Sequence, residues 1–281
     1  MTESLSRWRR HSRLARYWRY ARRNPAWIAM FVLSRFRSVS NWVVSVTRPP
    51  TLPLLPEEAS LFPELDVDAV VAELRQVGCS AQLRLPADIL GEMLSFATTE
   101  EPLPVKPKWL VRPAVRAFYP TFGEECGAAR RLASDAKIHN IAARYLESEP
   151  MLKSARLGWC FVGDRKTYRE LAPAQTIFHY DLADYRVLKF FFYLTDVDAN
   201  SGPHVCIRSS HTRKHWKHQF ALFAKQSDRE IYEAYGRENW WEIVGPAGFG
   251  FVEDVYCFHR GTPPVNCPRL MVKLTFTRHQ Y

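Results

Sequence analysis

The chain has 281 residues, of which 47% are hydrophobic and 24% are charged, enough for one globular domain with a sizeable core and an extension. Its six cysteines are scattered without a C-x-x-C pair, and the chain shows no signal-peptide cleavage pattern. Both observations argue against a disulfide framework or a zinc site and favour a reduced, cytoplasmic protein. The formal net charge of +10 is confined to one end: residues 1–48 contain eleven Arg, no Lys and a single acid, which leaves 28 basic and 28 acidic residues for the remainder.

The basic N-terminal segment, residues 1–48, is predicted to be helical. Its first half has basic residues at helical spacing, and its second half begins at Asn24-Pro25, a favourable start for a helix. The apolar run over residues 25–33 is about half the length that a bilayer-spanning helix needs. Tryptophans are interleaved with the Arg residues at Trp8, Trp18, Trp27 and Trp42. Such a helix is typical of a membrane interface, so we expect this segment to bind a membrane surface.

Three alternatives for this segment stay open. A contact with another copy of the chain, and hence an oligomer, explains the apolar run but not the excess of Arg. A nucleic-acid-binding arm uses the same charge without needing the apolar run, so no nucleic acid is expected as a partner. The third alternative is a plain solvated helix. Residues 49–60 are rich in Pro and predict an extended linker, which separates the basic segment from a domain over residues 61–281.

The domain over residues 61–281 mixes helices and strands. In chain order we expect helix 66–77 ended by Gly78, strand 80–85, helix 86–99, helix 128–146 and strand 155–163. Residues 187–194 are apolar on both alternating faces apart from Lys189. A strand with two apolar faces is buried on both sides, as in a closed pair of sheets.

The stretch QTIFHYDLADYRVLKFFFYLTDV, residues 175–197, places His179 and Asp181 two residues apart just before this strand. Residues two apart in an extended chain point to the same face, so the imidazole and the carboxylate converge. An H-x-D alone is weak evidence, since this composition gives one by chance in roughly one chain in three. A third ligand is His259, in VYCFHRG, and Arg269 follows at the start of a predicted strand.

Two histidines and one carboxylate form the facial triad of non-heme Fe(II) oxygenases, which leaves positions open for a co-substrate and O2. A guanidinium binds a carboxylate through two parallel hydrogen bonds, so Arg269 is suited to hold a distal carboxylate. The alternative is that His179 is an ordinary half-buried histidine on a strand. That alternative does not explain why His259 and Arg269 are also present.

These residues and their surroundings resemble the Fe(II)/2-oxoglutarate-dependent dioxygenases of the phytanoyl-CoA dioxygenase type. The resemblance runs from about residue 141 to residue 277 and includes IAARYLESEP, HYD, FFYLTDVDANSGPHVCIRSSH and GPAGFGFVEDVYCFHRG. It implies a mainly β fold with flanking helices, a double-stranded β-helix (jelly roll). It also implies that His179, Asp181 and His259 hold iron and that Arg269 binds 2-oxoglutarate.

By the same resemblance, Fe(II) is the cofactor, 2-oxoglutarate and O2 are co-substrates, and the reaction is a hydroxylation that yields succinate and CO2. Related halogenases replace the carboxylate ligand with a small residue, so Asp181 favours hydroxylation. The segment after the last His ligand reads R-G-T-P-P, which makes Thr262 the nearest hydroxyl partner for Arg269. Lys189 and Gln175 are further candidate contacts to the co-substrate.

The segment that follows Ser210-His211 is basic, and Arg208, His211 and Arg260 are candidates for binding an anionic substrate. Together with the basic N-terminal segment, this favours a lipid-linked anionic substrate at the cytoplasmic face of a bacterial inner membrane. The bacterial Kdo 3-hydroxylases, which hydroxylate a Kdo sugar of lipopolysaccharide, look like the best match among known relatives. The alternatives are a hydroxylase of a soluble small molecule or acyl-CoA, and a non-catalytic jelly-roll binding protein.

Overall fold

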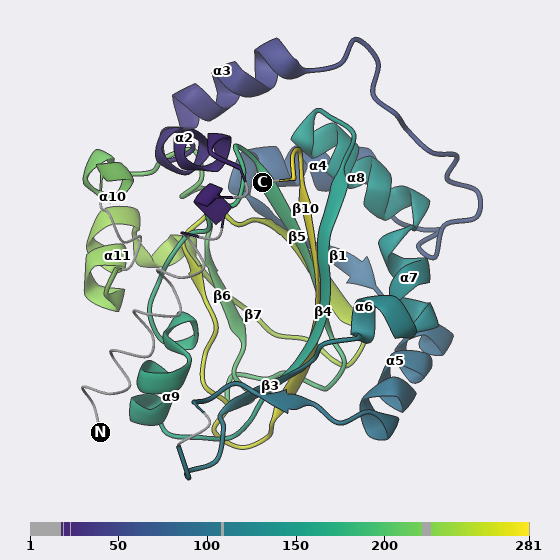
Figure 1. Cartoon of the computed structure of the whole chain (residues 1–281), viewed down its shortest axis with the longest axis vertical. Coiled ribbons are helices and arrows are strands. Elements are labelled where there is room, and N and C mark those ends of the chain that lie inside the picture. The colour runs from purple at the N-terminus through teal and green to yellow at the C-terminus, as the bar shows by residue number, and fades with distance from the viewer. Residues whose placement is uncertain (1–17, 19, 23, 108–109, 221–225, 281) are drawn as a thin grey trace.

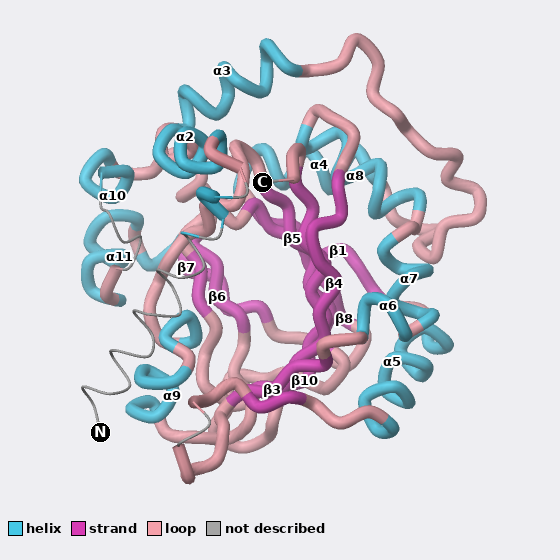
Figure 2. Tube along the Cα trace, viewed as in Figure 1, coloured by secondary structure: helices cyan, strands magenta, loops and turns pink. Residues whose placement is uncertain are grey.

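The structure, a computed structural model, describes residues 18, 20–22, 24–107, 110–220 and 226–280. Two antiparallel β-sheets face each other at its centre (Figures 1 and 2). The larger sheet has seven strands in the order β1-β8-β5-β10-β4-β3-β2, and the smaller has three in the order β7-β6-β9. The strands are β1 (Cys79–Arg84), β2 (Leu103–Pro104), β3 (Arg116–Tyr119), β4 (Met151–Cys160), β5 (Val187–Tyr193), β6 (His204–Ile207), β7 (Trp240–Ile243), β8 (Phe249–Asp254), β9 (His259–Arg260) and β10 (Arg269–Thr277).

The strands β5 and β10 are apolar on both faces because both faces of the larger sheet are buried there. Their outward-facing side chains belong to the main core: Phe190, Phe192, Leu270, Val272 and Leu274. Their inward-facing side chains pack between the sheets with residues of the smaller sheet: Phe191, Tyr193, Met271, Cys206 and Ile243. The predicted buried strand at residues 187–194 is therefore confirmed.

The outer face of the larger sheet is covered by helices α4 to α8 (Figure 1). Their bounds are α4 (Val67–Val77), α5 (Ala87–Thr99), α6 (Phe122–Glu125), α7 (Gly127–Ala133) and α8 (Ala136–Leu146). Gly78 ends α4 in the left-handed conformation, φ 84°, as expected of a helix-terminating glycine. The single helix predicted over residues 128–146 is wrong. The helix is interrupted before Asp135. The side chain of Asp135 accepts hydrogen bonds from the N–H groups of Lys137 and Ile138 and so caps the start of a new helix.

Helices α9 (Arg165–Leu171), α10 (Trp216–Phe220) and α11 (Asp228–Tyr235) lie on the side of the smaller sheet (Figure 1). Two short 3-10 helices, η1 (Pro173–Gln175) and η2 (Arg237–Asn239), follow α9 and α11. α11 begins with a capping box, in which Ser227 and Glu230 satisfy each other's backbone N–H groups.

Two helices of the basic N-terminal segment fall in the described part of the chain, α2 (Ala26–Leu33) and α3 (Arg37–Thr47). The predicted helix start is confirmed, because Asn24 Oδ1 accepts the N–H of Ala26 at 3.1 Å. The predicted helix in the first half of the segment lies largely outside the described residues. No helix that the structure describes is both long enough and apolar enough to cross a membrane.

Helix α3 begins at a buried cluster of polar contacts with the domain. Arg37 Nη2 lies 2.9 Å from Asp254 Oδ2, and the Asp254 side chain is 1% exposed. The hydroxyl of Tyr145 donates to the same oxygen at 2.5 Å. Just before α3, the backbone carbonyl of Arg35 accepts a hydrogen bond from the Tyr256 hydroxyl. The N-terminal helices are thus fixed to β8 and to the turn that follows it.

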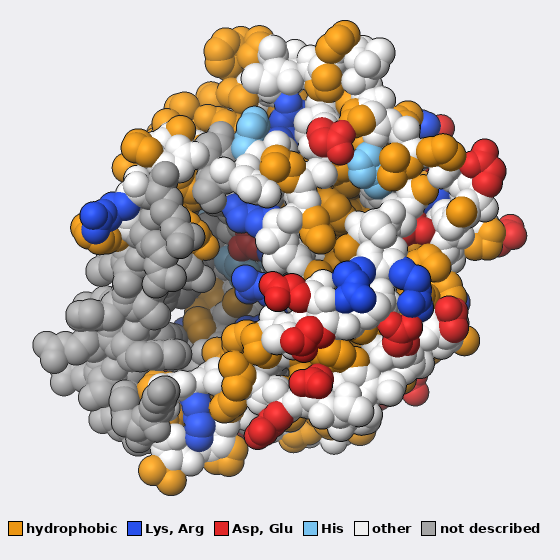
Figure 3. All heavy atoms as spheres, turned by 45° about the vertical axis from the view of Figure 1, so that its right-hand side comes forward, with side chains coloured by type: hydrophobic (Ala, Val, Ile, Leu, Met, Phe, Trp, Pro, Cys, Tyr) orange, Lys and Arg blue, Asp and Glu red, His pale blue; other side chains and the backbone are white. Residues whose placement is uncertain are grey.

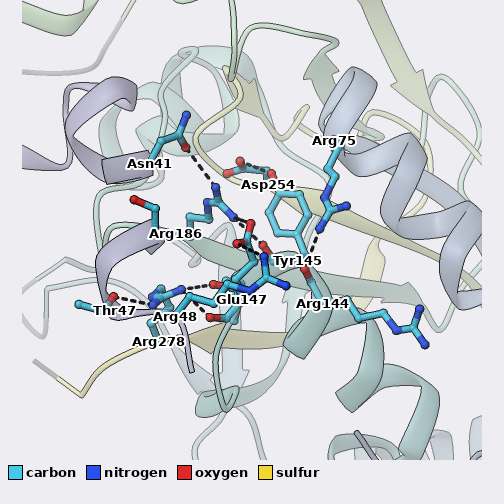
Figure 4. Close-up of polar contacts among 12 residues, drawn as sticks. Asn41, Thr47, Arg48, Arg75, Arg144, Tyr145, Glu147, Arg186, Asp254 and Arg278 are labelled. Carbon is cyan, nitrogen blue, oxygen red and sulfur yellow. Dashed lines mark hydrogen bonds and ion pairs between the residues drawn. The ribbon is translucent and has the colours of Figure 1, made fainter. Parts of the chain in front are cut away.

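Further along α3, two arginines of the domain reach the helix (Figure 4). Arg186 donates to Asn41 Oδ1 at 3.1 Å, and Arg278 donates to Thr47 Oγ1 at 2.7 Å. The predicted linker, residues 49–60, then runs without helix or strand to the start of the domain. In the described residues, the basic segment therefore packs on the domain along the whole of α3.

Candidate metal centre and co-substrate pocket

The two histidines of the predicted triad lie on paired backbone segments. The N–H of His179 donates to the carbonyl of His259 at 3.0 Å, and the reverse bond is 2.8 Å. His259 opens β9, whereas His179 lies in an extended segment with this isolated bridge, so the prediction of a regular strand at His179 is wrong. The bridge nevertheless puts both imidazoles together, with ring centroids 4.5 Å apart.

A backbone carbonyl orients each imidazole. His179 Nδ1 lies 3.1 Å from the carbonyl of Ile177, and His259 Nδ1 lies 3.0 Å from that of Cys257. Because a carbonyl only accepts, each Nδ1 carries the proton and each Nε2 keeps its lone pair. His259 Nε2 is 4.0 Å from Asp181 Oδ2, and one ligand atom from each triad residue lies within 4.8 Å of the others. Two imidazoles fixed in this tautomer and one carboxylate fit a divalent transition metal.

The charge states of the triad also suit metal binding. Burial lowers the pKa of His179 and lowers that of His259 to about 3, so both rings are neutral near pH 7. Burial opposes the charge of Asp181, but the Lys189 ammonium outweighs it and holds the pKa of Asp181 well below its usual range. Lys189 Nζ donates to Asp181 Oδ2. The structure therefore places Lys189 on the metal-binding carboxylate, and its contact with 2-oxoglutarate stays a prediction.

A buried His–Glu pair lies behind His259 and was not foreseen from the sequence. His204 Nε2 lies 2.8 Å from Glu253 Oε2, and Glu253 Oε1 lies 3.8 Å from His259 Nδ1. Burial raises the pKa of Glu253 to about 7, and burial lowers that of His204 well below its ordinary value. In the sequence, the only indication of this pair is the acid Glu253 within the otherwise apolar part of β8. This pair supports the ring of His259 from behind.

Arg269 opens β10 as predicted and is 1% exposed. Its Nη2 donates to Gln175 Oε1 at 3.1 Å and approaches Cys160 Sγ at 3.4 Å, whereas Nε and Nη1 have no hydrogen-bond partner in the part of the chain that the structure describes. Buried donors without acceptors are costly, and a carboxylate offers the two acceptors that a guanidinium needs. The side chain of Gln175 thus orients Arg269. The buried Oγ1 of Thr262, the predicted hydroxyl partner of Arg269, has no hydrogen-bond partner among the described residues, so its role beside Arg269 stays a prediction.

The residues predicted for substrate binding are each engaged with other parts of the described chain. Arg208 Nη2 donates to the carbonyl of Glu238 at 2.9 Å. Arg260 is 6% exposed, stacks on two aromatic rings and lies 3.6 Å from Asp228 Oδ2. His211 is 1% exposed, and its Nε2 lies 3.3 Å from a backbone carbonyl of α4. Their role toward substrate stays a prediction.

No protein-family model and no curated protein matches the chain, but solved structures do. HygX from Streptomyces hygroscopicus, solved with nickel, 2-oxoglutarate and hygromycin B, is 14% identical with a TM-score of 0.53, covering 76% of this chain and 88% of that one. EctD from S. alaskensis, solved with 2-oxoglutarate and 5-hydroxyectoine, is 16% identical with a TM-score of 0.52, covering 82% and 80%. The non-heme alpha-ketoglutarate-dependent epimerase SnoN from nogalamycin biosynthesis is 15% identical with a TM-score of 0.51, covering 75% and 82%.

These similarities confirm the predicted fold, a jelly-roll core with flanking helices. It is the fold of iron- and 2-oxoglutarate-dependent enzymes of several kinds. The finer resemblance, to phytanoyl-CoA dioxygenases and to Kdo 3-hydroxylases, is not distinguished by these neighbours and stays a prediction.

Proposed function

We propose that the protein is an Fe(II)/2-oxoglutarate-dependent hydroxylase. One combination of observations carries the proposal. The ligand atoms of His179, Asp181 and His259 lie within 4.8 Å of one another, and Arg269 is buried in the same domain with two unpartnered nitrogens. The similarity of the fold to HygX and EctD, whose structures hold 2-oxoglutarate, supports it.

Each residue has a separate task in this function. His179 and His259 would hold the iron through Nε2, which stays unprotonated because a backbone carbonyl accepts the proton of each Nδ1. Asp181, kept ionised by Lys189, would supply the third ligand. Arg269, oriented by Gln175, binds the far carboxylate of 2-oxoglutarate. Fe(II) with 2-oxoglutarate bound supplies the activation of O2, with succinate and CO2 as the products of the keto acid.

The proposed substrate is a membrane-associated anionic sugar, a Kdo sugar of lipopolysaccharide or its lipid A precursor, reached at the cytoplasmic face of the inner membrane. Two observations support a membrane surface as partner. Residues 1–48 carry the whole net charge of the protein. The described part of this segment also exposes apolar side chains by half or more of their surface: Ile28, Val32, Trp42 and Val46. Aromatic and aliphatic side chains beside arginines suit an anionic bilayer.

A second candidate substrate is a soluble small molecule. The structures of HygX and EctD hold hygromycin B and 5-hydroxyectoine respectively, and both proteins share the fold. In that case the exposed apolar residues of α2 and α3 serve a contact other than a membrane.

The first experiment is an anaerobic titration of the purified protein with Fe(II) and then 2-oxoglutarate, followed by absorption spectroscopy. We expect the charge-transfer band of a chelated keto acid, absent in His259→Ala and present in His215→Ala, which removes an exposed histidine outside the triad. A folded wild-type protein that gives no band contradicts the proposed reaction. Incubation with a Kdo-bearing lipid A precursor under O2 then tests the substrate: a mass gain of one oxygen supports the Kdo assignment. Its absence in an enzyme that shows the band favours the small-molecule alternative.

A further inference from the structure

The inner face of the larger sheet carries basic side chains on neighbouring strands. Strand β4 pairs with β10, and the register sets Cys160 opposite Arg269 and Arg156 opposite Lys273. On its other edge β4 pairs with β3, which sets Arg116 opposite Cys160. Directly opposed residues of antiparallel strands point to the same face, and so do residues four apart on one strand. The four basic residues therefore share one face.

This shared face is turned toward the metal centre. Met271, which stands between Arg269 and Lys273, packs between the two sheets, whereas the alternate residues of β10 lie in the core beneath the helices. The charges of Arg269 and Lys273 act on His204: burial lowers the pKa of His204 most, and these two charges lower it further. The ring of His204 stacks on that of His259. Figure 3 shows basic, acidic and histidine side chains together in a hollow near the centre of one face of the molecule.

Neither Arg156 nor Lys273 takes part in an ion pair among the described residues, whereas Arg144 and Arg186 do. The undescribed residues add a single acid, Glu3. Burial, followed by the charge of Arg116, lowers the pKa of Lys273 to about 7.

Adjacent like charges without a counter-charge destabilise a sheet. Lys273 is half-buried and Arg156 is exposed, so both remain within reach of a ligand from the solvent side. Arg116 and Arg269 lie in the row at the other end of the same face, where the far carboxylate of 2-oxoglutarate is expected. The Arg156–Lys273 pair is about four residues, or ~13 Å of strand, from that row. It is therefore separate from the row that is expected to hold the far carboxylate of 2-oxoglutarate.

We propose that Arg156 and Lys273 form a subsite for an anionic group of the substrate, a phosphate or a carboxylate carried on a sugar. The inference rests on the proposed function, because a substrate bound at this subsite would react only if the triad binds iron. The fork of the guanidinium and the compact ammonium together suit such a group, and a bound anion removes the repulsion between them. The substrate is thereby held on the side of the sheet where hydroxylation occurs.

The test measures the affinity for two probes by calorimetry, on protein loaded anaerobically with Fe(II) and saturated with 2-oxoglutarate. The probes are glucose 1,6-bisphosphate and free Kdo, which separate a phosphate from a carboxylate as the recognised group. In the double variant Arg156→Met/Lys273→Met we expect at least one probe to bind tenfold more weakly or worse, with the charge-transfer band unchanged. The matched control is Arg229→Met, which removes a positive charge from the exposed face of α11 and leaves both affinities as in wild type.

Thermal unfolding separates binding from a structural role. If the pair serves an anion, replacing Lys273 by Met leaves the melting temperature of the ligand-free protein unchanged or raises it. Lys137→Met, which removes an ammonium bonded to two backbone carbonyls, lowers it. Unchanged affinity for both probes in the double variant, or a fall in its melting temperature like that of Lys137→Met, overturns the subsite. Absence of the charge-transfer band in wild type contradicts the proposed function instead, so the two failures are distinguishable.

Discussion

At the scale of single residues, the expected role of Arg269 follows from the hydrogen-bonding state of its guanidinium. Two of its nitrogens are buried without acceptors. We expect Arg269→Leu to weaken 2-oxoglutarate binding by about a hundredfold. Each of two hydrogen bonds to a charged group contributes about 1.5–3 kcal/mol to binding. Titration of the charge-transfer band measures this. The affinity for Fe(II) alone stays as in wild type, and a variant that binds the keto acid normally would show that its carboxylate lies elsewhere.

Gly261 tests whether Gln175 orients that guanidinium. A Cβ at Gly261 would lie 1.7 Å from Gln175 Oε1, the far end of a flexible side chain. We therefore expect Gly261→Ala to fold but to displace Gln175 from Arg269. The dissociation constant for 2-oxoglutarate should rise severalfold, and Gln175→Ala should reproduce the effect. Gly91→Ala, at a glycine with open space around it, is the control and should change nothing.

The residues that sequence reasoning found are those whose chemistry repeats a local pattern. His179 and Asp181 stand two apart before a buried strand, and Arg269 opens another. What it missed depends on contacts between distant segments. Gln175 was predicted as a contact to the co-substrate, but its hydrogen bond to Arg269 was not, because the two residues are 94 positions apart in the sequence. The basic pair on β4 and β10 likewise becomes visible only through the strand register.

At the scale of elements, the contacts that hold helix α3 on the domain include a buried ion pair between Arg37 and Asp254. Removing one partner of such a pair leaves an uncompensated charge, which costs about 3 kcal/mol or more. We expect Arg37→Met to lower the free energy of unfolding by this amount, because the carboxylate of Asp254 is 1% exposed. Denaturant unfolding measures it. The control is Arg48→Met, whose side chain is 54% exposed in its pair with Glu147 and should matter by less than about 1 kcal/mol.

The pH dependence of this pair has a definite sign. Burial opposes the charge of Asp254, but Arg37 outweighs it and lowers the pKa of Asp254 below its usual value. In the unfolded chain an aspartate titrates near ~3.9, so the stabilisation is complete above that pH and is lost as the pH falls through the lower pKa of the folded state. The difference in unfolding free energy between wild type and Arg37→Met should therefore stay constant above about pH 4 and shrink as the pH falls from about 4 to about 2. A constant difference over this range would assign the effect of Arg37 to packing.

Helices and strands were predictable from the sequence where a local pattern marks the end of a helix or the burial of a strand. Gly78 ends α4 through its backbone conformation, and β5 is recognisable from its two apolar faces. The break between α7 and α8 was not predicted, because Asp135 lies within the predicted helix 128–146, whereas its side chain caps the start of α8. The docking of α3 was beyond reach, since Arg37 meets Asp254 across more than two hundred residues.

At the scale of the whole molecule, the N-terminal helices have one side that contacts the domain and another that exposes apolar side chains to solvent. One side holds Arg37 and the carbonyl of Arg35 against the domain. The other exposes Trp42 and Val46 of α3 by 65% and 61%. A truncation that removes the whole segment would strip Asp254 of its partner and unsettle the turn that leads to His259. It would therefore confuse a loss of membrane binding with a loss of the site.

A surface variant avoids this confusion, so the decisive protein is full-length Trp42→Ser/Val46→Ser. Both side chains point away from the contacts that fix α3, and each carries enough apolar area to contribute about 1 kcal/mol or more to partition into a bilayer interface. In sedimentation with vesicles of phosphatidylglycerol and phosphatidylethanolamine, we expect wild type to bind and the variant to bind at least tenfold more weakly. Leu103→Ser, at an equally apolar site exposed by 50% on β2, should bind as wild type does. The melting temperature and the charge-transfer band should be the same in all three proteins, because neither the ion pair of Arg37 nor the triad is touched. If wild type stays in the supernatant at low salt, the segment serves another contact, and the substrate is to be sought among soluble molecules that carry the anionic group.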